Sequence, residues 1–281
     1  MASALILSSH VASSRVGGSV QALALAQFKI DPILIPTVLY GRHPGWGAPG
    51  GAATPLDVLE GMLDGVEANG LLERVDLVIT GYFASAAQVR AAARAIDAVR
   101  AAPRAEGARR PIVVVDPVMG DSGKGLYVPQ EVAQAISTEL IRRADVVRPN
   151  AWELERMTGL SARDPQSAVN SARLLGRPTL VSSVERGQEI GAVYADKTEA
   201  WFAAHARLSS VPSGTGDLMT ALFAAALSEG QPVSYALARA VSGVAETITA
   251  AAAWRSAELP VVAMGAKIKA ASPSVRIERL G

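Results

Sequence analysis

The sequence predicts an α/β protein with a mostly parallel sheet, helices on both faces and an antiparallel edge. Short runs rich in β-branched residues alternate with alanine-rich helical stretches. The strand-like runs are apolar throughout, which is typical of parallel strands buried on both faces. The strands expected after Gly187 follow one another closely, which favours an antiparallel edge. No Pro-, Gly- or Ser-rich linker divides the chain, so we expect one domain over residues 1–281.

The expected strands are the short β-branched runs at residues 4–9, 32–40, 77–81, 112–116, 146–148, 179–183, 190–194 and 200–204. The expected helices lie between and after them, at residues 18–28, 55–69, 86–102, 130–142, 151–158, 165–175, 216–227 and 234–254. Two long loops, 41–53 and 117–129, each follow a predicted strand. Because ligands of parallel sheets bind beyond the carboxyl ends of the strands, we expect a site there.

The amino-acid composition excludes or disfavours several classes of function. With 27 Lys and Arg against 26 Asp and Glu, the net charge is +1, which argues against nucleic-acid and membrane-surface proteins. The chain has no cysteine, which excludes disulfides, thiolate metal sites and cysteine nucleophiles, and its three histidines argue against a multi-histidine metal site. No apolar run reaches the roughly 18 residues of a membrane span, and no secretory signal is expected. We expect a soluble, cytoplasmic protein whose chemistry depends on carboxylates, hydroxyls and backbone amides.

Two phosphate-loop patterns are rejected. Residues 45–50 read G-x-G-x-x-G, but Pro44 and Pro49 interrupt them and no helix begins before Pro55. A dinucleotide fingerprint needs a tight turn from strand to helix with free amides. Residues 120–125 resemble a Walker A loop only in part, because its first glycine and its final Ser or Thr are missing. A nicotinamide oxidoreductase therefore has no support.

The segment from Ser213 to Asp217, Ser-Gly-Thr-Gly-Asp, carries the strongest catalytic pattern and stands directly before an apolar helix. Free amides at a helix N-terminus bind anions, and glycines let the backbone approach the ligand. The Asp217 carboxylate could accept a proton from a substrate hydroxyl, as phosphoryl transfer needs. The helix dipole is expected to favour its ionised form. The alternative is a helix capped by Ser213 or Thr215.

Further acidic side chains follow other predicted strands. Asp116 ends a buried strand and Asp121 follows in the next loop, a pattern that suits Mg²⁺ but also fits turn chemistry at Asp-Pro. Asn150 and Glu153 could lie near phosphate and metal-bound water, or simply form a capping box. His10, at the end of the first strand, could orient a polar ligand or be a structural histidine.

Several short motifs, taken in chain order, carry a family resemblance. They are Ser-His-Val at 9–11, residues 38–43, Thr-Gly-Tyr at 80–82, Asp-Pro-Val-Met-Gly-Asp at 116–121, Tyr-Val-Pro at 127–129, Pro-Asn with Glu at 149–153, Ser-Ser at 182–183 and Gly-Thr-Gly-Asp at 214–217. From about residue 4 to about residue 255 the chain resembles the pyridoxal kinases, which belong to the vitamin-kinase branch of the ribokinase-like superfamily.

This resemblance implies a three-layer α/β/α sandwich and ATP-dependent phosphorylation of the 5′-hydroxymethyl group of pyridoxal, with pyridoxamine and pyridoxine as further candidates. It implies Asp217 as general base and the amides of Gly214, Thr215 and Gly216 as the groups that hold the transferring phosphoryl. Members use ATP and Mg²⁺, many also need K⁺, and they are usually homodimers.

The resemblance also implies three sets of binding residues. The metal set is Asp116, Asp121 and Glu153. The pyridoxal pocket is lined by Ser9, Val16, Tyr40, His43 and Tyr82, beside Asp217. The ATP set is Asn150, Glu153, Ser182, Ser183, Asp121, Tyr127, Gly214 and Gly216, with the 121–127 loop covering the nucleotide.

Some positions depart from the family pattern. Pro44 stands where members often have Thr, and proline offers neither a hydroxyl nor an amide hydrogen. Ser213 stands at an often apolar position, and Arg148 is bulkier than the small residues common before Pro-Asn. Bacterial members often have Lys near residues 182–183, although the Ser form resembles animal enzymes. The departures concern substrate fit more than phosphoryl transfer and leave the preferred vitamer open.

Two alternatives stay open. A hydroxymethylpyrimidine kinase belongs to the same branch, but those enzymes commonly have a cysteine in the anion-hole loop and a Gly-Gly-Ala-Gly-rich start, and neither is present. A non-catalytic protein that binds B6 vitamers could keep the fold without the activity. The retention of Asp217, both glycines and the acidic residues argues against such a loss.

Overall fold

The computed structural model describes residues 2–208, 211–270 and 274–281. Its main sheet has ten strands: β1 (Ser3–Val11), β2 (Asp31–Tyr40), β3 (Gly51–Ala53), β4 (Val75–Thr80), β5 (Ile112–Val115), β8 (Val146–Val147), β9 (Thr179–Arg186), β10 (Glu189–Ala195), β11 (Ala200–Ala206) and β12 (Arg276–Leu280). They are ordered β12-β11-β10-β9-β8-β5-β4-β1-β2-β3. A separate hairpin pairs β6 (Gly120–Asp121) with β7 (Gly125–Leu126).

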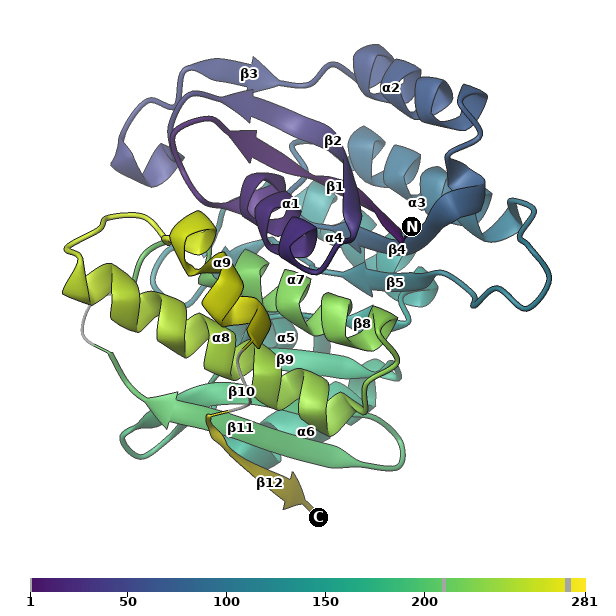
Figure 1. The fold of residues 1–281 in the computed structure, drawn as a ribbon. Coiled ribbons are helices and arrows are strands. Elements are labelled where there is room, and N and C mark those ends of the chain that lie inside the picture. Colours follow the sequence, from purple (N-terminus) through teal and green to yellow (C-terminus); the bar gives the residue numbers. More distant parts are fainter. Residues whose placement is uncertain (1, 209–210, 271–273) are drawn as a thin grey trace.

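The strands from β9 to β2 run parallel, and β10, β11 and β12 add an antiparallel edge, as predicted. The helices lie on both sides of the sheet (Figure 1). They are α1 (Gly17–Gln27), α2 (Leu56–Ala68), α3 (Ala86–Ala101), α4 (Gln130–Ala135), α5 (Ala151–Thr158), α6 (Pro165–Leu175), α7 (Thr215–Ser228), α8 (Val233–Ala253) and α9 (Val261–Ala270). The result is the predicted three-layer α/β/α arrangement.

Both faces of the sheet are buried because successive strand residues point to opposite sides. In β1, Ile6 packs in the cluster that contains residues of α1, α7, α8 and α9, whereas Leu5 and Leu7 pack in the cluster of α3 and α4. A third cluster packs α5 and α6 on β9, β10 and β11. The apolar, unalternating strands of the sequence are explained by this double burial.

Elements that depend on long-range packing were missing from the sequence prediction. β3 and β12 are short edge strands, and α9 is held by Val261, Met264 and Ile268, which pack in the same cluster as α1 and α8. The helix expected over 130–142 is irregular: α4 ends at Ala135 and continues as a π-helical turn over 136–140 and a 3-10 turn over 141–143.

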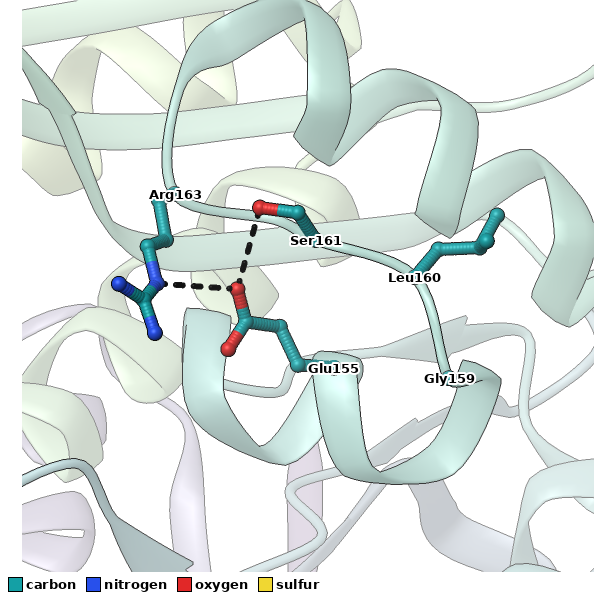
Figure 2. Close-up of a pocket in the computed structure, with 5 residues that line it drawn as sticks. All are labelled: Glu155, Gly159, Leu160, Ser161 and Arg163. Carbon is teal, nitrogen blue, oxygen red and sulfur yellow. Dashed lines mark hydrogen bonds and ion pairs between the residues drawn. The ribbon is translucent and has the colours of Figure 1, made fainter.

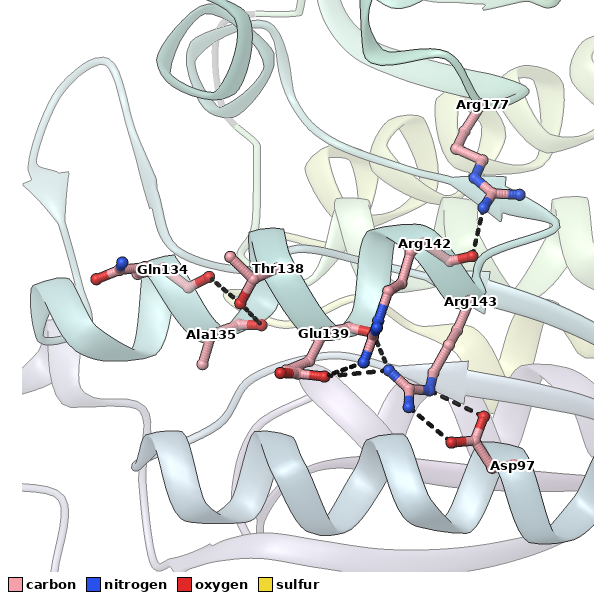
Figure 3. Close-up of polar contacts among 8 residues, drawn as sticks. All are labelled: Asp97, Gln134, Ala135, Thr138, Glu139, Arg142, Arg143 and Arg177. Atoms are coloured by element: carbon pink, nitrogen blue, oxygen red, sulfur yellow. Dashed lines mark hydrogen bonds and ion pairs between the residues drawn. The ribbon is translucent and has the colours of Figure 1, made fainter.

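Side chains support the irregular end of this segment (Figure 3). The Arg143 guanidinium donates to both carboxylate oxygens of Asp97 in α3, at 2.9 and 2.6 Å, and to the backbone oxygen of Glu139 at 2.7 Å. The arginine therefore ties the last turns to α3 and satisfies a carbonyl that the regular helix would have used.

In the three described stretches of chain, no helix combines the length and apolar character needed to cross a bilayer.

Candidate active site

The site forms where several parallel strands end. Asp116 directly follows β5, Arg148 and Asn150 follow β8, and Asp217 lies in the first turn of α7. In the sheet β5 is flanked by β4 and β8, so its C-terminal end meets those of its neighbours at one edge. Topology therefore gathers side chains that are up to about a hundred residues apart in sequence, as the hydrogen bond from Thr220 to Asp116 shows.

A buried ion pair lies at the centre of the site. Arg148 Nη1 donates to Asp116 Oδ1 at 3.3 Å, and the two side chains are 6% and 1% exposed. The Thr220 hydroxyl donates to the other oxygen, Oδ2, at 2.8 Å. Burial raises the pKa of Asp116, whereas the Arg148 charge and these hydrogen bonds lower it. Both oxygens of Asp116 are thus already engaged by protein donors.

The N-terminus of α7 begins without a side-chain cap. Its N-cap residue is Gly214 at φ +91°, and no cap side chain bonds the first turn, so the alternative of a cap at Ser213 or Thr215 is wrong. Of the first amides, that of Asp217 is bonded to its own carboxylate. A Cβ on Gly214 would lie 2.0 Å from the backbone oxygen of Arg15, so only glycine fits. The other first amides of α7 are therefore available to bind an anion.

Asp217 projects from this turn toward α1. A hydrogen bond from the Gly17 backbone and the charge of Arg148 favour its ionised form, but burial and the nearby Asp116 act more strongly and raise its pKa to about 6. Desolvation and a like charge therefore outweigh the helix dipole, which favours the ionised form. The side chain is still mostly ionised at pH 7 and can accept a proton.

Glu153 and Asn150 form the capping box that was the structural alternative for this pair. Glu153 Oε1 accepts from the amide of Met119 at 2.9 Å, and Oε2 accepts from the amide of Asn150 at 2.9 Å. Burial and, to a smaller extent, the nearby Asp116 raise the pKa of Glu153 to about 8, although the hydrogen bonds from these amides and the charge of Arg148 lower it. Asn150 Nδ2 donates to the Gly120 carbonyl at 2.8 Å. The pair therefore holds the loop after β5 against the start of α5.

Asp121 lies apart from the other two predicted metal ligands. Its Oδ1 accepts from the amides of Gly123 and Lys124 at 2.8 and 2.9 Å, and Oδ2 accepts from the Tyr127 hydroxyl. The carboxylate therefore closes its own β6–β7 hairpin. No three His or acidic side chains of the described chain come together to hold a metal ion. The three predicted metal ligands therefore do not form one cluster, although both oxygens of Asp116 and the Oε2 of Glu153 keep a lone pair beyond those that their protein donors use.

Three of the predicted nucleotide residues lie side by side: Asn150 after β8, and Ser182 and Ser183 within β9. Asn150 and Ser182 form an isolated parallel bridge, and the Ser182 amide donates to the Pro149 carbonyl at 3.0 Å. The next residue, Ser183, is the extra residue of a β-bulge; it is exposed at φ +62°. Bulges and positive φ values at non-glycine residues are typical of functional sites. The sequence contained no signal for this strain.

The predicted vitamin residues gather beyond β1 and β2. A Cβ on Gly17 would lie 2.0 Å from Ser9 Oγ, so Ser9 is in contact with the turn that bonds Asp217, and the adjacent Val16 is buried. Burial, then the nearby Tyr40, raises the pKa of Tyr82. The pKa of His43 is lowered by burial and then by Lys124 of the β6–β7 turn. His43 Nδ1 accepts from the Gly45 amide at 3.0 Å, while His10 pairs with Ser19 at 3.1 Å as a structural histidine would.

Two central residues were not predicted. Thr220 lies one turn after Gly216 and shares its helix face, which a helical reading of α7 could have shown. Arg148 was noted only as a departure. A surface hollow elsewhere is lined by Glu155, Gly159, Leu160, Ser161 and Arg163 (Figure 2). It contains none of the motif residues, and its carboxylate is paired with Arg163 at 3.4 Å.

Comparisons with known proteins indicate the family to which the chain belongs. The model of the family described as phosphomethylpyrimidine kinase matches residues 69–262. A pyridoxine/pyridoxal/pyridoxamine kinase of Bordetella avium is 33% identical over 82% of this chain and 78% of its own. A pyridoxal kinase of Corynebacterium diphtheriae is 29% identical over 92% of each chain.

Solved structures give the same result. A pyridoxal kinase of Entamoeba histolytica superposes with a TM-score of 0.90 and 26% identity over 100% of both chains. That of Leishmania donovani, in complex with ADP and pyridoxine, superposes with a TM-score of 0.92 and 25% identity over 99% of both. This chain therefore belongs to the phosphomethylpyrimidine kinase family, and within it to the pyridoxal kinases.

Proposed function

We propose that this enzyme transfers the γ-phosphoryl group of ATP to the 5′-hydroxymethyl group of pyridoxal, with pyridoxamine and pyridoxine as further substrates. Asp217 accepts the proton of the hydroxyl group, and the oxygen attacks the γ-phosphorus in line. The bond from that phosphorus to the bridging oxygen of ADP breaks, and ADP leaves. The amides of Gly214, Thr215 and Gly216 stabilise the charge on the transferring group.

The observation that carries the proposal is the position of Asp217 at an uncapped helix N-terminus. The first turn of α7 has no side-chain cap and favours an anion, and the carboxylate in the same turn faces Gly17 and the vitamin side of the site. A hydroxyl group there would lie between a proton acceptor and a phosphoryl-binding turn. This combination suits phosphoryl transfer to an alcohol, which needs a proton acceptor and an anion site side by side.

The two substrates would bind on opposite sides of this turn. Ser9, Val16, Tyr40, His43 and Tyr82 would hold the vitamer, while Asn150, Ser182 and Ser183 would contact the nucleotide, with the 121–127 hairpin and Tyr127 over it. We keep Mg²⁺ as a companion of the ATP phosphates, which it would contact through their oxygens and water. K⁺, a homodimer and a cytoplasmic location remain expectations from the family resemblance and the composition.

A coupled assay of ADP release tests the proposal, with pyridoxal, pyridoxamine, pyridoxine and hydroxymethylpyrimidine measured side by side. We expect the highest kcat/KM with a B6 vitamer. Hydroxymethylpyrimidine kinase is the second candidate, because the matching family model is described by a phosphomethylpyrimidine activity. A higher kcat/KM with hydroxymethylpyrimidine would favour it, and vitamer binding without any ADP release would indicate a non-catalytic binding protein.

A further inference from the structure

Arg148 places a permanent positive charge inside the site. The side chain starts at the end of β8 and is 6% exposed, and its guanidinium lies between two groups of the phosphoryl-transfer machinery. Nη1 donates to Asp116 Oδ1, and Nη2 would lie 2.2 Å from a Cβ placed on Gly216. A guanidinium stays protonated at every pH at which proteins are folded, so this charge cannot be removed by titration.

The ion pair with Asp116 leaves donors of the guanidinium unused. The one hydrogen bond that it makes within the described part of the chain is 3.3 Å long, whereas strong Arg–carboxylate bonds are about 2.7–2.9 Å and often paired. The Nε of Arg148 is buried and has no hydrogen-bond partner among the described residues. The Nε atoms of Arg100, Arg104 and Arg239 are unpaired in the same way, so this atom alone marks no ligand site. What distinguishes Arg148 is that its Nη groups lie against Asp116 and against Gly216 in the first turn of α7.

The surroundings indicate that a ligand at this guanidinium is an anion. Arg148 lowers the pKa of Asp116, Glu153 and Asp217, so all three carboxylates lie within reach of its charge. Without it, three acids would repel the phosphates of ATP. The guanidinium also borders Gly216 in the first turn of α7, a helix N-terminus that has no side-chain cap and that favours anions.

We propose that Arg148 binds the γ-phosphate of ATP and remains on the phosphoryl group during its transfer, which makes it a catalytic residue. The inference extends the proposed function and uses the same step. Arg148 forms and breaks no covalent bond; its N–H groups hold phosphoryl oxygens while the oxygen of the vitamer replaces that of ADP. A planar guanidinium suits this task because it binds two oxygens at once.

The opposing interpretation is structural: Arg148 only neutralises Asp116. The variants Arg148→Ala and Arg148→Lys test this interpretation, with Arg239→Lys as a matched control. Arg239 is another buried arginine; it lies in α8 and pairs with Glu229 at 2.8 Å. For Arg148→Ala we expect kcat to fall by about 10²–10³-fold, as when an oxyanion-hole donor is removed. For Arg148→Lys we expect a smaller loss, and for the control an unchanged kcat with a lower Tm.

Calorimetric titration with ATP and with ADP, both in EDTA, examines the contact without metal and without vitamer. If Arg148 contacts the γ-phosphate, the preference for ATP over ADP falls by about tenfold in Arg148→Ala and is unchanged in the control. Millimolar guanidinium chloride should restore part of the kcat of Arg148→Ala and leave the control unaffected. If Arg148→Ala does not fold, Arg148→Lys undergoes the same titrations.

An unchanged ATP-to-ADP preference together with a kcat within twofold of the wild type would overturn the inference. The proposed function is judged separately, by the wild-type protein. If the wild type phosphorylates no B6 vitamer but its ATP preference depends on Arg148, the function fails and the phosphate contact stands. If it phosphorylates pyridoxal and the Arg148 variants behave like the control, the function stands and the inference fails.

Discussion

Asp217 is the residue whose ionisation decides the proposed chemistry, and its surroundings contain groups that raise its pKa and groups that lower it. Burial and Asp116 raise its pKa to about 6, while the Gly17 amide and the Arg148 charge limit the rise. A carboxylate with a pKa nearer to neutrality is a better general base than a free aspartate, provided that it remains ionised at the working pH. The same burial that opposes its charge therefore increases its basicity.

Replacement of Asp217 by Asn should separate catalysis from structure. The variant keeps the shape of the side chain but loses its charge and its proton acceptor. We expect kcat to fall by about 10²–10⁴-fold, with little change in the KM of ATP and pyridoxal. Steady-state kinetics with a coupled assay measures both quantities. A near-normal kcat would show that Asp217 is structural and that another group accepts the proton.

The pH dependence of kcat/KM follows from the same pKa. The protonated carboxyl cannot accept the proton of the hydroxyl group, so activity requires the form present above about pH 6. We expect kcat/KM to decrease about tenfold per unit below that pH and to level off above it. A pH–rate profile in buffers of constant ionic strength checks this. A flat profile down to about pH 4.5 would contradict the role of Asp217.

At the scale of elements, the start of α7 depends on one glycine. Gly214 has φ +91°, and a Cβ there would lie 2.0 Å from the Arg15 oxygen, so Gly214→Ala should displace the turn and abolish most activity. Gly176→Ala is the control, because Gly176 has φ +73° with open space around it. It should cost about 1–2 kcal/mol of unfolding free energy through backbone strain alone.

Urea unfolding and the ADP-release assay measure the two effects. Equal activity in the two variants would mean that the turn at Gly214 tolerates displacement, and the anion site would then have to lie elsewhere.

Two loops that follow strands face each other across the site. Lys124 of the β6–β7 turn contributes to the low pKa of His43 in the loop after β2, so their charges interact. We expect both loops, 41–53 and 121–127, to close over ligands. Hydrogen exchange with ATP and pyridoxal bound should be slower in both segments than in the free protein. Equal exchange in the two states would argue against closure.

At the scale of the whole molecule, the buried acids make stability depend on pH. Asp217 and Glu153 have pKa values of about 6 and about 8, above their ordinary values of 3.8 and 4.5. Between its ordinary value and its raised value, each carboxyl is more protonated in the folded state than in the unfolded state. The stability from these protons is therefore complete at low pH and is lost as pH rises through about 6 and then about 8.

We therefore expect the free energy of unfolding to decrease from about pH 5 to about pH 8. The part of this decrease that Asp217 causes is complete above about pH 6, and Asp217→Asn should remove it. The variant should therefore be more stable than the wild type at pH 8. Urea unfolding across this pH range gives both curves. An increase in wild-type stability from pH 6 to pH 8 would contradict the raised pKa of Glu153, and parallel curves of the wild type and Asp217→Asn below pH 6 would contradict that of Asp217.

The sequence by itself determined most of the fold and several residues of the candidate site, although Thr220 was missed and Arg148 was noted only as a departure. Apolar strands without alternation predicted a sheet buried on both faces, and turn residues and caps placed α5 and α6 correctly at Ala151–Thr158 and Pro165–Leu175. These features are local, since they depend on side-chain periodicity and on capping within one turn. The motifs at Asp116 and Asn150 follow β5 and β8, and the motif that ends in Asp217 opens α7, where the candidate site forms.

The tertiary structure decided what local patterns do not contain. Edge strand β12 and helix α9 exist because they pack on β11 and on the α1–α8 layer, not because of strong propensities. The pKa of Asp217 rises because burial and Asp116 reach it from other elements. Arg148 enters the site because β8 ends beside β5, which brings its charge to Asp116 and Gly216. Such effects arise from distances across the fold, and a sequence records no distances.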